Sequence, residues 1–224
     1  MTKQNLLHDA VQYPFKGNGK YVLLWGALLG VATDLASLAG PLAFFALLVL
    51  SAYFCATFFE ILVTSATGSS EEPGFPNLAD IVDDIIYPYL KVVSCILVSF
   101  APSFIYGWSV GSGDGSPVIS LVLLLLGAVY LPMAILAVGI LDSFTAMLPQ
   151  TVLPAIPRAG GLYWVIVAIL FAVTMVTNFV DAVLGDVFVI GSLVMAAVSM
   201  LGLMINGRLL GLLYREKADE LDWI

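Results

Sequence analysis

The stretch YVLLWGALLGVATDLASLAGPLAFFALLVLSAYFCATFFEILVTS, residues 21–65, decides the fold class. It is almost wholly apolar, and as one straight helix of about 45 residues it would measure roughly 68 Å. The hydrocarbon core of a bilayer is only about 30 Å thick, so the chain must turn back within this stretch. Gly40-Pro41 is the expected turn, because glycine permits a tight bend and proline is tolerated in the first turn of a helix. The stretch therefore predicts two membrane-spanning helices, Tyr21–Leu38 and Pro41–Ser65.

The composition of the whole chain agrees with a membrane protein. Of its 224 residues, 61% are hydrophobic and 11% are charged. A soluble domain is about half apolar and about a quarter charged. The net charge of −8, from 16 acidic and 8 basic residues, argues against a nucleic-acid partner, which would require a basic patch.

The rest of the chain contains further apolar stretches of helical length. They predict helices at Tyr89–Trp108, Val118–Met147, Leu162–Leu184 and Val187–Tyr214. The second of these exceeds one upright span, so we expect a kink at Pro132, and we expect Pro149, Pro154 and Pro157 to stop any regular helix. The prediction is an all-α transmembrane bundle of about six helices. It comprises a cytoplasmic N-terminal segment 1–20, a transmembrane domain 21–214 and a cytoplasmic C-terminal tail 215–224.

An acidic segment precedes the predicted helix at Tyr89–Trp108. After the polar loop 68–77, Asn77 is the expected N-cap, and apolar residues from Leu78 to Tyr89 recur at helical spacing. The opposite face carries Asp80, Asp83 and Asp84. Such an amphipathic segment either lies in the membrane surface or packs across the cytoplasmic ends of the bundle. We regard its three aspartates as candidates for docking a partner.

The basic residues set the predicted orientation. In a six-helix chain with the N-terminus inside, all of them fall on the cytoplasmic side, and the opposite loops contain none. Cytoplasmic loops carry the excess of Lys and Arg, so both termini are predicted to be cytoplasmic, as in a multi-pass protein of the bacterial inner membrane. The bases are Lys3, Lys16, Lys20, Lys91, Arg158, Arg208, Arg215 and Lys217.

Ionisable residues inside predicted spans are candidates for function. Glu60, Lys91, Asp142 and Arg208 all fall near the inner ends of their helices, where pairing or snorkelling explains them. We expect Glu60 to contact Arg208 or Lys91, because the three lie at one depth.

The outer half of the predicted bundle offers a second polar group. Asp34, Asn178 and Asp181 lie toward the outer ends of their helices, away from any Lys or Arg, and would be the site of an ion- or proton-handling protein.

Two small-xxx-small patterns, Gly26/Gly30 and Gly207/Gly211, permit close approach of helices. The sequence leaves open whether they pack within the chain or against another subunit, and Gly26 and Gly30 are candidates for docking a partner.

No catalytic or cofactor-binding motif is visible in the sequence. It lacks H-E-x-x-H, G-x-S-x-G, a phosphate-binding loop and a dinucleotide fingerprint, and it has a single histidine, His8. Cys55 and Cys95 fall inside apolar segments with no metal-binding spacing. We therefore expect no enzyme, no cofactor and no metal. The leading hypothesis is a non-catalytic subunit or scaffold that contacts other membrane-protein subunits and the lipid bilayer. The alternative is a small solute or ion transporter or channel.

Three stretches carry a resemblance to a known group of proteins. They are EEPGFPNLADIVDDIIYPYL at 71–90, YLPMAILAVGILDSFTAMLPQTVLPAI at 130–156 and GRLLGLLYREKADELDWI at 207–224. In these the chain resembles bacterial multi-pass inner-membrane proteins of unknown function that are distantly similar to Yip1-type proteins. The resemblance implies an inner-membrane helical bundle and assigns no site residues.

Overall fold

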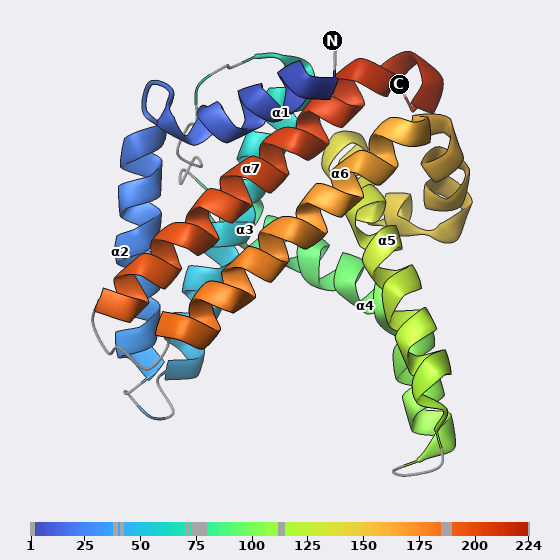
Figure 1. The fold of residues 1–224 in the computed structure, drawn as a ribbon, viewed down its shortest axis with the longest axis horizontal. Coiled ribbons are helices and arrows are strands. Elements are labelled where there is room, and N and C mark those ends of the chain that lie inside the picture. The colour runs from blue at the N-terminus through green and yellow to red at the C-terminus, as the bar shows by residue number, and fades with distance from the viewer. Residues whose placement is uncertain are drawn as a thin grey trace.

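The computed structural model of the protein describes residues 3–37, 40, 43–69, 72, 80–111, 115–184 and 190–223, and within these residues it contains helices and no strand. Figure 1 shows that the helices form a bundle with both termini at the same end. In chain order the elements are α1 (Lys3–Gln12), η1 (Tyr13–Phe15), α2 (Gly19–Ser37), α3 (Ala43–Thr67), η3 (Val82–Ile86), α4 (Tyr87–Val110), α5 (Pro117–Leu141), η4 (Phe144–Met147), α6 (Pro149–Leu184) and α7 (Ile190–Leu221).

Five helices of the described chain are long and apolar enough to cross a membrane. They are Leu47–Thr67, Val82–Val110, Pro117–Leu141, Pro149–Val180 and Leu193–Leu221, and Gly19–Ala32 of α2 is a sixth, shorter apolar helix. The expectation of a multi-pass helical membrane protein is thus confirmed. The predicted hairpin in the opening stretch is also present, since α2 ends at Ser37, α3 begins at Ala43, and Gly40 between them has a φ of 62°.

Helix α7 lies at the centre of the bundle and packs on α2, α3 and α6 (Figure 1). Its contact with α3 is close because Gly207 and Gly211 face the α3 backbone. A Cβ at Gly211 would lie 2.5 Å from the Leu62 carbonyl oxygen. This pattern therefore packs within the chain, and the backbone positions of α3 and α7 constrain one another.

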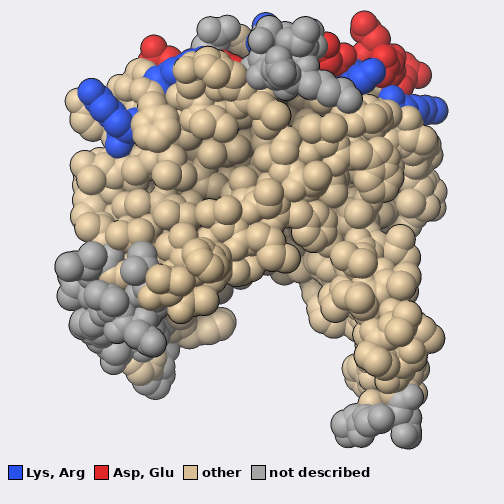
Figure 2. Space-filling model, viewed as in Figure 1, with Lys and Arg blue, Asp and Glu red and all other residues tan. Residues whose placement is uncertain are grey.

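The α4–α5 hairpin is the most exposed part of the described bundle. Figures 1 and 2 show that its outer half stands apart from the other helices, with a recess between them. Its surface is apolar, and Trp108 near the tip is 90% exposed. The buried residues of α5 begin only at Gly127 and continue to Val138, so the hairpin is anchored to the core by its inner half.

The region between α5 and α6 differs from the predicted one. α5 stops at Leu141 because Asp142 adopts the left-handed conformation, with a φ of 49°. Pro132 lies inside α5, and the excess length that suggested a kink belongs instead to η4. The prediction that the prolines after Pro149 prevent a helix is wrong. α6 starts at Pro149, where the missing N–H costs nothing, and bends at Gly160.

Both terminal segments are more structured than expected. Residues 3–12 form a helix whose Leu6 and Ala10 side chains are buried. α7 passes the predicted boundary at 214 and reaches Leu221 after a kink at Lys217, where φ is −121° and ψ is 15°, and Leu221 is buried in the main core. Trp223 stacks on Tyr214 with ring centroids 5.9 Å apart. The predicted tails are therefore parts of the folded bundle.

Candidate functional site at the charged end of the bundle

The charged side chains visible in Figure 2 gather at one end of the molecule, the end at which Figure 1 places both termini. The segment that organises this end is α1 with η1. Leu6, Ala10 and Tyr13 recur at helical spacing, and all three are buried, which explains why this mostly polar segment forms a helix against the bundle. α1 and η1 pack on α7 and bring the N-terminal segment next to the last helix.

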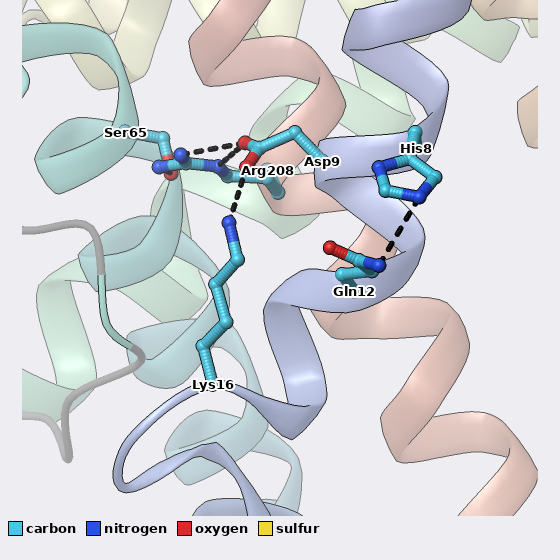
Figure 3. A network of polar contacts seen from close by, with 6 residues as sticks. All are labelled: His8, Asp9, Gln12, Lys16, Ser65 and Arg208. Atoms are coloured by element: carbon cyan, nitrogen blue, oxygen red, sulfur yellow. Dashed lines mark hydrogen bonds and ion pairs between the residues drawn. The ribbon is translucent and has the colours of Figure 1, made fainter.

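Arg208 of α7 is the most deeply buried charge described, at 3% exposure. Its Nε and Nη2 atoms donate hydrogen bonds to Oδ2 of Asp9 at 3.0 and 2.7 Å, and its Nη1 atom donates to Oγ of Ser65 at 3.2 Å (Figure 3). The guanidinium also lies over the Tyr13 ring, 4.7 Å from its centroid. Each guanidinium nitrogen thus has a partner, as a charge removed from water requires.

Asp9 is shared by two cations. Its other carboxylate oxygen, Oδ1, accepts a hydrogen bond from Nζ of Lys16 (Figure 3). Burial alone would raise the pKa of Asp9, but the hydrogen bonds from Lys16 and Arg208 outweigh it and lower the pKa below its ordinary value of 3.8. The carboxylate is therefore ionised at neutral pH. His8 and Gln12 hydrogen-bond each other on the outer face of α1 and take no part in this network.

The prediction that Glu60 contacts Arg208 or Lys91 is therefore wrong. Among the described residues Glu60 forms no ion pair with Arg208 or Lys91, and Asp9 takes its place at Arg208. Asp9 and Tyr13 were not expected at this site, because residues 1–20 were predicted to be a cytoplasmic segment outside the transmembrane domain. The signal that would have revealed them is the spacing of Leu6, Ala10 and Tyr13.

Lys91 forms the second buried pair at this end. Its Nζ atom bonds to Oδ1 of Asp142 and lies over the rings of Tyr87 and Phe59, 4.7 and 5.8 Å from their centroids. Lys91 is buried, whereas the Asp142 side chain is 80% exposed. This geometry agrees with the expectation that ionisable residues near the inner helix ends pair or snorkel. The aliphatic part of the Lys91 side chain contacts apolar residues, and its ammonium group reaches a solvent-exposed carboxylate.

The described part of the acidic segment begins at Asp80. Asn77, the expected N-cap, lies outside the described residues, and Asp80 makes cap-like hydrogen bonds to the backbone that follows it. Its Oδ1 accepts hydrogen bonds from the N–H groups of Val82 and Asp83 at 3.0 and 3.4 Å. Asp84 bonds back to the N–H of Asp80 at 3.0 Å. Asp83 is exposed.

The apolar residues of this segment are exposed too. Ile81 is 65% exposed and Val82 is 57% exposed, beside the carboxylates of Asp80 and Asp83. η3 contacts α3 and α4, whereas Ile81 and Val82 at its start remain exposed. Whether the segment lies in the membrane surface or packs across the bundle stays a prediction.

The other candidate residues are not brought into this site. Asp34 lies in α2 and Asp181 in α6, but their side chains are outside the described set, and Asn178 is exposed on α6. The prediction that Gly26 and Gly30 dock a partner is wrong, because both pack within the chain. A Cβ at Gly26 would lie 2.5 Å from Met200, and one at Gly30 would lie 2.3 Å from Ala196, so both glycines face α7 of the same chain.

Within the described residues there is no group of three or more His, Cys, Asp or Glu side chains placed to hold a metal ion. No family model, curated protein or solved structure matches the chain. The resemblance to Yip1-type proteins therefore stays a prediction.

Proposed function

We propose that this chain is a non-catalytic subunit or scaffold of a larger membrane complex. In this proposal six helices cross the bacterial inner membrane and both termini are cytoplasmic. Two observations support the topology. The termini lie at one end of the bundle (Figure 1), and the visible charges gather at that end (Figure 2). An even number of crossings with the basic residues inside satisfies both.

The observation that carries the scaffold role is the exposed segment at the start of the α4 span. Ile81 and Val82 expose bulky aliphatic side chains, while Asp80 and Asp83 expose carboxylates beside them. The cytoplasmic leaflet is anionic, so it attracts bases and disfavours such an acidic surface. Ile81 and Val82 stand at the very start of the Val82–Val110 span, at the membrane boundary, where water disfavours their aliphatic groups. A protein segment that is both basic and apolar satisfies both halves of the surface, and we assign this role to another subunit of the complex.

A site-specific photo-cross-linker tests the proposal in intact cells. Placed at Val82, it should give an adduct with one protein of defined mass. The adduct should be lost when Asp83 is changed to Lys, because Asp83→Lys reverses the charge offered to a basic partner without removing the Asp80 cap. The matched control is a cross-linker at Leu153, which is 56% exposed and belongs to the same end of α6 as Arg158. Only lipid adducts at Val82, or the same protein adduct at Leu153, would contradict the proposal.

A further inference from the structure

The N-terminal segment is attached to the bundle by apolar packing and by contacts of Asp9 and Tyr13 with Arg208. Leu6, Ala10 and Tyr13 supply the apolar contacts, and each is less than 5% exposed. Asp9 supplies the ionic contact to Arg208, 199 residues later in the chain. The remaining described face of α1 is polar or exposed, including His8 and Val11. The segment therefore lies across α7 as a single layer, visible at the charged end in Figure 1.

The two sides of the Asp9–Arg208 contact differ in how freely they can move. Arg208 is held in place, because its neighbour Gly207 packs against α3, with a Cβ position 3.1 Å from Cγ2 of Ile61. Gly211, one turn later, packs still more closely on α3. Asp9, in contrast, belongs to a helix of 10 residues that is too short to be stable without its packing.

A break in the helix separates this segment from α2. Lys16 is extended, with φ −79° and ψ 140°, and Gly17 has a φ of 46°. α2 begins at Gly19. A glycine in the left-handed region between two helical segments is a position where the backbone direction changes at low cost, so residues 16–18 are suited to act as a hinge. The Glu72 side chain lies directly against Gly17.

We propose that α1 and η1 form a strap that opens at residues 16–18, with the Asp9 carboxylate as its latch on Arg208. Closed, the strap covers Arg208 and the apolar cluster of Val22, Ile61 and Met204 around Tyr13. Open, it presents a guanidinium and an apolar patch at the charged end of the bundle while α2–α7 stay folded.

Amide hydrogen exchange of the full-length protein in nanodiscs, read by mass spectrometry, tests the strap directly. In Asp9→Asn the amides of residues 3–15 should exchange about 10- to 100-fold faster than in the wild type, since a hydrogen bond to a charged group is lost. Exchange in α3 and α7 should be unchanged. Asp219→Asn is the matched control, because Asp219 is an exposed acid of the same end outside the network, and it should leave residues 3–15 protected.

A charge swap separates a latch from a general loss of fit. Asp9→Arg together with Arg208→Asp should restore part of the protection of residues 3–15 that Asp9→Arg alone removes. Unchanged exchange in Asp9→Asn would show that the carboxylate is no latch. Equal deprotection of residues 3–15 and of α7 in that variant would show that the segment is a core element and no strap.

Discussion

Gly160 offers the sharpest test of the backbone geometry that shapes the charged end. It lies at the bend of α6 with φ 63° and ψ −150°, a region that only glycine enters without strain. A Cβ built there meets no atom within 4 Å, so Gly160→Ala has no steric cost from its neighbours. The expected penalty is the backbone strain alone, about 1–3 kcal/mol.

The adjacent Gly161 is a matched control. It too has nothing within 4 Å of an added Cβ, but its φ is not in the left-handed region. Gly161→Ala should be neutral or stabilising by up to about 1 kcal/mol, because alanine lowers the entropy of the unfolded chain. The same entropy gain applies to Gly160→Ala, so the difference between the two variants isolates the strain.

The measurement is the apparent free energy of unfolding in mixed micelles, titrated with a denaturing detergent and followed by circular dichroism. Gly160→Ala should be less stable than Gly161→Ala by about 1–3 kcal/mol. Equal stabilities of the two variants would refute the bend at Gly160.

Two further predictions concern the other polar residues. Asp142→Asn should destabilise the protein by about 1–3 kcal/mol, because it leaves the buried Lys91 cation without its partner. Lys91→Met should cost less, because it leaves only the exposed Asp142 carboxylate in water. The same detergent titration measures both variants, and equal losses of stability would contradict this prediction. Asp34→Asn and Asp181→Asn, alone or together, should leave complex assembly intact, measured by co-purification after gentle extraction; loss of the complex would favour the transporter hypothesis instead.

The span pattern was readable from the sequence because the bilayer imposes a simple physical requirement. Each crossing needs a run of about 20 apolar residues, and turns such as Gly40-Pro41 interrupt those runs. The position of Lys91 and Asp142 near the inner ends of their helices was also predicted, but the expected partner of Lys91 was Glu60, and the structure pairs Lys91 with Asp142 instead.

The Asp9–Arg208 contact was not predicted, because the depth of residues in the membrane does not show which of several acidic residues pairs with a given basic residue. That choice depends on tertiary packing over 199 residues of sequence separation. The helix starting at Pro149 was missed for a related reason. Proline at the first position of a helix is favourable, and the chain tolerates Pro154 and Pro157 in a short segment whose Val152 and Ala155 side chains are buried in the core.

The location of the N-terminus tests the central proposal most directly, because it distinguishes six crossings from five when the C-terminus is cytoplasmic. An epitope fused before Met1 should be inaccessible to antibody in spheroplasts until the inner membrane is permeabilised. An epitope at residue 113, between α4 and α5, should be accessible without permeabilisation and serves as the positive control. An N-terminal epitope that is stained in intact spheroplasts would contradict the six-helix topology with both termini inside.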